Sequence, residues 1–229
     1  MVIGNGLIAS QFYDYHLNPD VVIFASGVSN SSSNDLAGFR REKDLLLEAI
    51  QKYPERKLVY FSTCSIYDPS LQQSYYVQHK LEVEAIIQKK AKRYLILRLS
   101  NPIGKNNNPH TFFNFFVNCI QGNQPFEVWS HAERNIIDVD DFYKLAKAMI
   151  DNAEFGNQVL NLANPHNYKV LEIVEATEKY FGIKGNYTVM KKGNRLAINT
   201  DLVSSLAPKL HIEFEPDYIQ KLLQKYFPL

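Results

Sequence analysis

Short apolar segments alternate with longer amphipathic segments along most of the chain. Strands buried on both faces of a parallel sheet are apolar throughout, whereas the helices that cover such a sheet are apolar on one side only. The amphipathic pattern is clearest over Phe39–Lys52, where the apolar residues fall on one stripe and charges occupy the rest. This alternation predicts an α/β fold built on a parallel sheet.

Five strands and six helices follow from the pattern. The predicted strands are Val2–Ile3, Val21–Ala25, Leu58–Ser62, Tyr94–Leu99 and Gln158–Leu162. The predicted helices are Leu7–Tyr15, Phe39–Lys52, Tyr76–Lys90, Phe112–Gln121, Val139–Asn152 and Val170–Phe181. After Gly104 the sequence changes to Asn- and Pro-rich loops mixed with aromatic residues. We therefore expect a main domain over residues 1–103 and a second lobe over 104–229, from which strand 158–162 returns to the sheet.

Composition excludes several classes of protein. The 229 residues have a formal net charge of +1 and are 45% hydrophobic, which is enough for a packed core without suggesting a nucleic-acid partner. The basic run 89–93 is interpreted as the exposed end of a helix. We expect no signal peptide and no membrane span, because no apolar stretch approaches about 18 residues. Cys64 and Cys119 form neither a disulfide framework nor a metal site, so we expect a cytoplasmic protein without a bound metal.

A glycine turn follows the first predicted strand and begins a helix. In the sequence Gly4-Asn5-Gly6-Leu7-Ile8-Ala9, the first glycine allows a tight turn and the second lets the backbone approach a pyrophosphate. The amides at the helix N-terminus would then face the phosphates. A purely structural turn is the alternative, but the position between strand and helix favours dinucleotide binding.

The adenosine side of a dinucleotide site is not recognisable. Only Ser10–Pro19 separates the first helix from Val21–Ala25, which leaves no room for another strand and its crossover. The acidic residue that normally follows a second strand and holds the adenosine ribose is therefore missing. The sequence predicts a Rossmann-like, doubly wound parallel sheet that is shortened on its adenosine side.

Tyr76 and Lys80 are four residues apart and hence share one face of a helix. Their proximity predicts that Lys80 lowers the pKa of the Tyr76 phenol, so that it could exchange a proton near neutral pH. Thr63 lies at the end of the preceding strand, on the same edge of the sheet as the glycine turn. The three residues form a proton-transfer set for a carbonyl/alcohol pair, in which a cofactor must supply the hydride.

These segments together resemble the extended short-chain dehydrogenases/reductases, especially the NAD-dependent nucleotide-sugar epimerases, dehydratases and ketoreductases. The stretch Ser62–Tyr67 is similar to the family's S-T-x-x-V-Y, and Arg98–Gly104 to R-x-x-N-x-Y-G. Arg134–Asp141 is similar to R-D-F-I-x-V-D-D. The other segments that carry the resemblance are Gly4–Ala9, Asp20–Ser26, the Tyr76/Lys80 pair, and Asn161–Asn164 followed by Val170–Ile173.

The resemblance implies NAD or NADP as cofactor, a nucleotide sugar as substrate, and the possibility of a homodimer. It implies that Tyr76 is the general acid/base, that Lys80 tunes it and binds the nicotinamide ribose, and that Thr63 holds the reacting oxygen. The cofactor-binding residues that it implies are Gly4, Asn5, Gly6, Leu7, Ile8, Ala25, Ser26, Gly27, Lys80 and Ile103. The substrate-binding residues are Thr63, Cys64, Ser65, Asn101 and Arg134, the last on the diphosphate.

Two departures from the family pattern change what is expected. Cys64 and Ser65 stand where the 4,6-dehydratases have an Asp-Glu pair, so dehydration is not expected. Phe39 stands about where the family often has a structural Asn.

For several residues a purely structural role is the alternative to a role in the site. Arg134 could instead pair with Asp138 or Asp140. Arg40 and Arg41 could contact the 2′-phosphate of NADP, although an exposed helix face is the simpler interpretation. His110 and His131 lie in loops without metal-ligand spacing. Trp129 and Phe126 are expected to pack the second lobe rather than to stack on a base. The phenylalanines of one helix are expected to bury it, namely Phe112, Phe113, Phe115 and Phe116.

The leading hypothesis is an NAD(P)-dependent oxidoreductase or epimerase that acts on a nucleotide-activated sugar, of the 4-keto-sugar reductase or 4-epimerase type. A second hypothesis is a binding or regulatory protein that kept the fold but lost turnover. A third is a fragment completed by a partner chain, which predicts an exposed apolar edge at the first strand.

Overall fold

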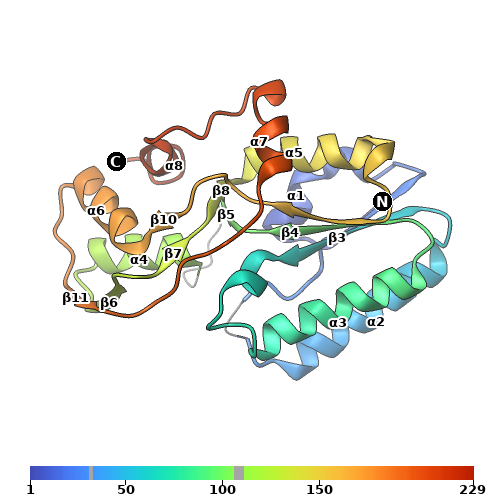
Figure 1. Ribbon diagram of the computed structural model, residues 1–229, viewed down its shortest axis with the longest axis horizontal. Coiled ribbons are helices and arrows are strands. Elements are labelled where there is room, and N and C mark those ends of the chain that lie inside the picture. The colour runs from blue at the N-terminus through green and yellow to red at the C-terminus, as the bar shows by residue number, and fades with distance from the viewer. Residues whose placement is uncertain (31–32, 106–110) are drawn as a thin grey trace.

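A five-stranded parallel sheet forms the centre of the computed structural model, which describes residues 1–30, 33–105 and 111–229 (Figure 1). The strand order is β1-β2-β3-β4-β9, and every neighbouring pair is parallel. The strands are β1 (Val2–Ile3), β2 (Val21–Phe24), β3 (Lys57–Thr63), β4 (Tyr94–Leu99) and β9 (Gln158–Leu162). All five predicted strands are confirmed. His110 and part of the serine-rich stretch after β2 lie outside the described residues.

Helices cover both faces of this sheet (Figure 1). One face carries α2 (Leu36–Lys52) and α3 (Tyr75–Lys90). The other carries α1 (Leu7–Gln11), α5 (Val139–Asp151) and α7 (Asp201–Leu206). The helical segment predicted to run to Tyr15 is divided, because α1 ends at Gln11 and a separate 3-10 turn follows.

The side chains of β2 show how the sheet separates two apolar layers. Val22 and Phe24 pack with α2 and α3, whereas Val21 and Ile23 pack with α1 and α5. Alternate residues of a strand point to opposite faces, and both faces here are buried. This is why the strand is apolar at every position.

The crossover β1-α1-β2 has the opposite hand from the crossover that follows it. Strands β1, β2 and β3 are adjacent and parallel, yet α1 and α2 lie on opposite faces. Parallel crossovers are right-handed in about 98% of cases, and β3-α3-β4 has the same hand as β2-α2-β3, so β1-α1-β2 is the exception. In a doubly wound sheet α1 would lead to a second strand beyond β1, whereas β1 forms the edge of this sheet. The topology therefore confirms a Rossmann-like sheet that is shortened beside β1.

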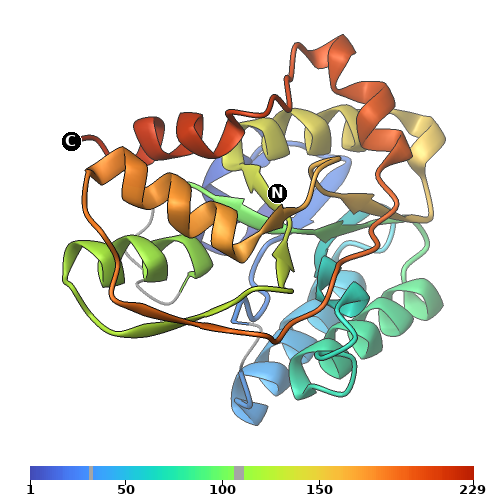
Figure 2. The same cartoon turned by 60° about the vertical axis from the view of Figure 1, so that its left-hand side comes forward.

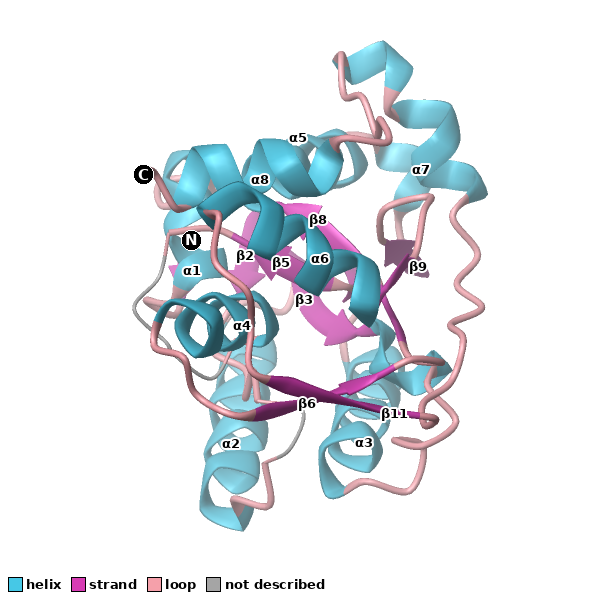
Figure 3. Ribbon diagram, turned by 90° about the vertical axis from the view of Figure 1, so that its left-hand side faces the viewer, coloured by secondary structure: helices cyan, strands magenta, loops and turns pink. Residues whose placement is uncertain are grey.

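In the part of the chain that the structure describes, the second lobe contains three two-stranded sheets and three helices (Figure 2). Its strand pairs are β5 (Asn101–Ile103) with β8 (Ile136–Asp138), β6 (Phe126–Trp129) with β11 (Tyr187–Met190), and β7 (Glu133–Arg134) with β10 (Tyr168–Lys169). Its helices are α4 (Phe112–Gln121), α6 (Val170–Phe181) and α8 (Tyr218–Tyr226). Figure 3 shows α4 and α6 in front of the central sheet.

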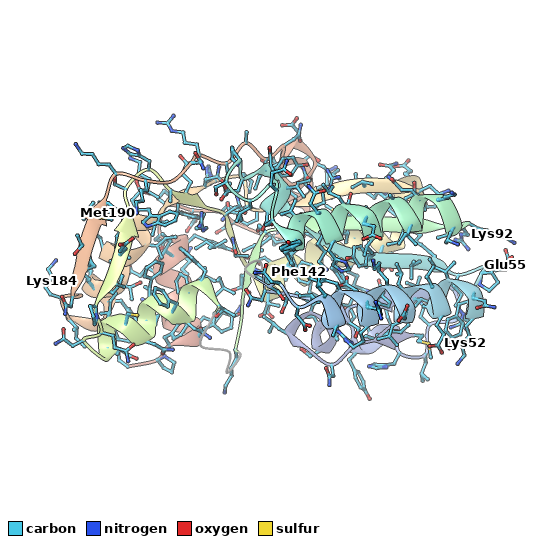
Figure 4. The ribbon with its side chains drawn as sticks, turned by 90° about the horizontal axis from the view of Figure 1, so that it is seen from below. Lys52, Glu55, Lys92, Phe142, Lys184 and Met190 are labelled. Carbon is cyan, nitrogen blue, oxygen red and sulfur yellow. The ribbon has the colours of Figure 1, made fainter. Side chains whose placement is uncertain are left out.

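The division of the chain into sheet and lobe is less simple than a boundary at residue 103. Besides β9, helices α5 and α7 come from the second half of the chain and pack on the sheet. The segment between β11 and α7 runs back from the lobe to the sheet (Figure 2). Figure 4 shows the two ends of the molecule, with Lys184 and Met190 on the lobe and Lys52, Glu55 and Lys92 beyond the sheet.

The tight turn after β1 requires glycine at position 4. Gly4 has φ +129°, and a Cβ there would lie 2.3 Å from the carbonyl oxygen of Ala25. We expect Gly4→Ala to lower the free energy of unfolding by about 1–3 kcal/mol or more, measured by urea denaturation. Gly6→Ala is the matched control, because a Cβ at Gly6 meets no atom within 4 Å. Equal stability of Gly4→Ala and wild type would contradict the prediction.

Candidate active site

A cavity of about 730 Å³ lies at the carboxyl edge of the sheet and is bounded on its far side by the lobe. Ligands of open α/β sheets bind at this edge. The residues predicted for the site line it, with the exception of Gly4: Asn5, Gly6, Leu7, Ile8, Ala25, Ser26, Gly27, Thr63, Cys64, Ser65, Tyr76, Lys80, Asn101, Ile103 and Arg134. Gly4 instead packs its backbone against Ala25. The structure thus brings residues from distant parts of the sequence, from Asn5 to Arg134, around one cavity.

Other lining residues were not expected from the sequence. Phe112 and Phe115 are three positions apart on α4 and face the cavity, whereas Phe113 and Phe116 pack the lobe. The helical spacing of four phenylalanines could have shown that they do not share one face. Leu196 also lines the cavity, but it lies in an irregular segment that no sequence motif marks.

Tyr76 lies at the start of α3, almost completely buried. Burial raises the pKa of its phenol to about 12, and the hydroxyl of Thr63 only partly opposes this by hydrogen bonding. The prediction that Lys80 lowers the pKa of Tyr76 is therefore wrong for the ligand-free protein. Its phenol remains protonated at neutral pH.

Lys80 is also buried, one helical turn beyond Tyr76. Its Nζ donates to Glu42 Oε1 at 2.9 Å and to the Tyr60 hydroxyl at 3.0 Å, and it lies 5.8 Å from the centroid of the Tyr76 ring. Burial lowers the pKa of Lys80, and the Glu42 carboxylate opposes that change. The Glu42 carboxylate explains why Lys80 does not lower the pKa of Tyr76. It compensates the charge of Lys80 and itself raises the pKa of the phenol.

Thr63 ends β3 and caps the short 3-10 turn that follows. Its Oγ1 accepts from the Ser65 backbone N–H at 3.0 Å and lies 3.0 Å from the Ser65 hydroxyl. Both residues line the cavity together with Tyr76. The site therefore has a phenol and two aliphatic hydroxyls on one wall.

Cys64, between these two hydroxyls, is buried, and its thiol is protonated at neutral pH. Its Sγ donates to the Arg98 carbonyl oxygen at 3.1 Å, and burial raises the pKa of the thiol to about 12. A thiol with such a pKa is neither an acid nor a nucleophile at neutral pH.

Arg134 lies at the lobe end of the cavity, and its partner differs from both sequence alternatives. Its Nη1 is 3.8 Å from Asp68 Oδ2, and its guanidinium lies 5.5 Å from the centroid of the Phe112 ring. Asp138 and Asp140 instead pair with Lys225. The hypothesis that Arg134 pairs with either of them is therefore wrong.

Arg41 reaches the opposite end of the cavity, whereas Arg40 remains on the outer face of α2. The Nη1 and Nη2 atoms of Arg41 donate to the side-chain and main-chain oxygens of Ser26 at 3.0 and 2.9 Å. His131 is exposed outside the cavity lining. We expected Trp129 and Phe126 to pack the lobe. Phe126 is buried there, but Trp129 is 40% exposed.

The charges of the cavity favour an anionic ligand. Its described lining contains three cationic side chains, Arg41, Lys80 and Arg134, against one carboxylate, Asp68. Asp68 is already close to Arg134, and Lys80 is compensated from behind by Glu42. The cations are spread from the glycine turn to the lobe, which suits a ligand with phosphates at more than one place.

The sequence matches the model of the NAD dependent epimerase/dehydratase family over residues 8–163. The chain belongs to this family. No curated protein sequence matches it.

Solved structures of epimerases and dehydratases share the fold of this family member at low sequence identity. UDP-glucuronic acid 4-epimerase from Bacillus cereus, in complex with UDP-glucuronic acid and NAD, has a TM-score of 0.72 and 18% identity over 90% of this chain and 74% of its own. UDP-glucose 4-epimerase from Thermus thermophilus, in complex with NAD, has a TM-score of 0.64 and 14% identity over 90% and 76%. The dTDP-glucose 4,6-dehydratase from Bacillus anthracis, in complex with NAD, has a TM-score of 0.66 and 16% identity over 97% and 77%.

The described residues also bear on metal binding and on membrane insertion. The described residues contain no group of three or more His, Cys, Asp or Glu that could hold a metal ion. Across the same part of the chain, no helix is both long and apolar enough to cross a membrane.

The burial of Cys64 predicts that its thiol is unreactive in the folded protein. In a Cys119→Ser variant, iodoacetamide at pH 8 is expected to leave Cys64 unmodified, because burial raises the pKa of the thiol to about 12. The same variant in urea should be alkylated completely, as followed by intact-protein mass spectrometry. Rapid alkylation of the native protein would contradict the burial of this wall of the site.

Proposed function

We propose that the protein is an NAD(P)-dependent oxidoreductase or epimerase that acts on a nucleotide-activated sugar. The observation that carries this proposal is the wall formed by Tyr76, Lys80 and Thr63 in a cavity with the glycine turn at one end and Arg134 at the other. The family match and the NAD complexes of related folds support the cofactor.

The residues of the chain divide the cavity between cofactor and substrate. The glycine turn, Ala25, Ser26 and Gly27 would hold the dinucleotide, with the amides at the start of α1 facing its pyrophosphate. Arg41 lies beside Ser26 and would contribute a positive charge where the usual ribose carboxylate is missing. Because a guanidinium suits a phosphate better than a ribose hydroxyl, this arrangement leaves NADP open beside NAD.

Arg134 would bind the diphosphate of the nucleotide sugar at the lobe end. UDP-glucuronic acid and UDP appear in the complexes of structures that share the fold, and such ligands carry a diphosphate. The sugar would then lie between Arg134 and the wall of hydroxyl groups, with Asn101 and Ser65 beside it.

The chemistry would centre on the C4 oxygen of the sugar. The nicotinamide would supply or accept the hydride, while Tyr76 would donate the proton to the oxygen or remove it. Thr63 would hold that oxygen by a hydrogen bond, and the charge of Lys80 would bind the nicotinamide ribose. A resting phenol with a pKa of about 12 suits proton donation, the direction that a 4-keto-sugar reductase requires.

A dehydratase reaction is not part of the proposal. Elimination of water needs an acid and a base close to the sugar, in addition to the hydride transfer. Cys64 and Ser65 occupy the corresponding positions, and the thiol of Cys64 is buried and strongly protonated. Neither side chain supplies a carboxylate.

Replacement of Tyr76 separates chemistry from binding. We expect Tyr76→Phe to lower turnover by about 100-fold or more, since general acid/base groups contribute about 10²–10⁴-fold, while dinucleotide affinity changes little. Turnover is measured with NADH and NADPH on 4-keto sugar nucleotides, and with UDP-sugars for epimer formation, followed by NMR. Affinity is measured by calorimetry.

Tyr75→Phe is the matched control, because Tyr75 is the neighbouring tyrosine and is 65% exposed. Turnover retained in Tyr76→Phe would refute the mechanism. Dinucleotide binding without turnover in the wild type would favour the binding or regulatory hypothesis, and no thermal shift with NAD, NADH, NADP or NADPH would refute both.

Replacement of Arg134 tests the substrate end alone. We expect Arg134→Gln to weaken the binding of UDP- or dTDP-sugars by about tenfold or more, because it removes charge-assisted hydrogen bonds to the diphosphate. Dinucleotide affinity should not change. Arg195→Gln is the control, since Arg195 has an 88% exposed side chain, pairs with Glu133 at 3.7 Å and does not line the cavity. Unchanged sugar-nucleotide affinity in Arg134→Gln would contradict the assignment.

A further inference from the structure

Glu42 is a carboxylate in the middle of α2 that has no exposed surface. A buried charge is costly unless it is paired and hydrogen-bonded, so its surroundings indicate why it is kept there. The side chain lies behind Lys80 as seen from the cavity, and Lys80 is the one of the two that reaches the cavity lining. Glu42 therefore acts on a ligand only through Lys80.

Four donors from three parts of the fold saturate the Glu42 carboxylate. Oε2 accepts from the Val28 backbone N–H at 2.7 Å and from His79 Nε2 at 2.9 Å. Oε1 accepts from the Tyr60 hydroxyl at 2.6 Å and from Lys80 Nζ at 2.9 Å. These contacts lower the pKa of Glu42 to about 2 despite its burial, so the carboxylate is ionised at any pH at which the protein works.

The same arrangement fixes the ammonium of Lys80. An ammonium has three N–H donors, and two of them are bound to Glu42 and Tyr60. The third is left for a ligand. Gly27 closes over the pair so tightly that a Cβ there would lie 2.7 Å from Lys80 Nζ and 2.8 Å from Glu42 Oε1. The ammonium is thus held at one point beside the backbone that follows β2.

Other titratable groups around Lys80 do not replace Glu42. Glu84, one helical turn further along α3, accepts from Arg98 at 2.7 Å and from the Ser62 hydroxyl at 2.5 Å. Tyr60 and Tyr76 are neutral at neutral pH, because burial raises the pKa of both phenols. The Cys64 thiol is neutral for the same reason. His79 contacts Glu42 rather than Lys80. Glu42 is the carboxylate in direct contact with the ammonium.

We propose that Glu42 is a positioning residue of the active site: it holds the Lys80 ammonium charged inside the protein, with one N–H directed to the bound dinucleotide. The proposal rests on the proposed function for the identity of that ligand. In a merely structural role, in which the cluster only joins α2 to α3, the pH dependence of dinucleotide affinity would not follow the titration of Lys80.

The test is the titration of Lys80 by NMR in ligand-free protein labelled with ¹³C and ¹⁵N in lysine. The Lys80 signal is identified by its loss in Lys80→Met. Glu42→Gln keeps the shape of the side chain but removes its charge, so burial is no longer opposed. We expect Lys80 to lose its proton at a pH at least about one unit lower than in the wild type.

Two variants control this measurement. Glu82→Gln removes an exposed carboxylate of α3 that is 3.0 Å from Lys43, and it should leave the titration of Lys80 unchanged. Glu42→Asp keeps the charge, so Lys80 should lose its proton at a pH close to the wild-type value. If Glu42→Gln does not fold, Glu42→Asp carries the test, because its shorter reach should shift the titration in the same direction by a smaller interval.

The pH dependence of dinucleotide affinity gives a second readout. As the pH rises, Glu42→Gln should lose dinucleotide affinity at a lower pH than the wild type does. The difference between these two pH values should equal the shift in the titration of Lys80. An unchanged Lys80 titration in a folded Glu42→Gln variant would overturn the proposal. Where only Glu42→Asp folds, the absence of even the smaller shift would do so. If the wild type binds no dinucleotide, the proposed function fails, but the titration in ligand-free protein still decides whether Glu42 controls Lys80.

Discussion

The buried ion pair between Glu42 and Lys80 is the constraint on which the site depends. It joins α2 to α3, with further contacts to β3 through Tyr60 and to the turn after β2 through Val28. Removing one partner of such a pair typically costs about 3–5 kcal/mol, because the other charge is left buried alone. The two helices therefore cannot slide past each other without a large cost. Tyr76 begins the same helix as Lys80, so its position opposite Thr63 follows from this constraint.

The shortened edge of the sheet places a second constraint on function. In a complete doubly wound sheet, strands beyond β1 would cover one side of the adenosine and supply a carboxylate for its ribose. Here β1 is the edge, and α1 lies on the face where it would otherwise lead to those strands. The glycine turn and the ends of β2 and β3 are kept. The half of the cavity that would hold the nicotinamide is thus preserved more completely than the half that would hold the adenosine, where Arg41 lines the rim.

Strands β3 and β4 and helices α2 and α3 could be predicted because each is long enough to show its own pattern. A strand such as Lys57–Thr63 is buried at every position, and α2 and α3 are 17 and 16 residues long. The strands of the lobe have two to four residues, and their pairing partners lie far away in sequence, as for Tyr187–Met190 beside Phe126–Trp129. Their stability comes from tertiary contacts, so local patterns do not reveal them.

Spacing and order could predict which residues line the cavity, but not their electrostatics. The four-residue spacing places Tyr76 and Lys80 on one side of α3, as the pattern predicted. Glu42 was counted among the charges of an amphipathic helix, whose polar residues normally face solvent. A buried glutamate differs from an exposed one only in its partners, and those come from β3, α3 and the turn after β2. Because these contacts form only in the folded protein, the spacing of Tyr76 and Lys80 could not show that Glu42 compensates the charge of Lys80.

The compensation of Lys80 has a consequence for how the site would work. A lysine that is paired with a buried carboxylate offers little net positive charge to a phenol several ångströms away, since the two opposite charges largely cancel at that distance. Tyr76 then keeps the high pKa that its burial produces. Any positive charge that lowers it must enter with a ligand, because the described cavity lining has its other cations at the two ends, in Arg41 and Arg134. Under the proposed function, Glu42 would thus make proton removal by Tyr76 depend on ligand binding, whereas the protonated phenol of the resting protein could donate its proton.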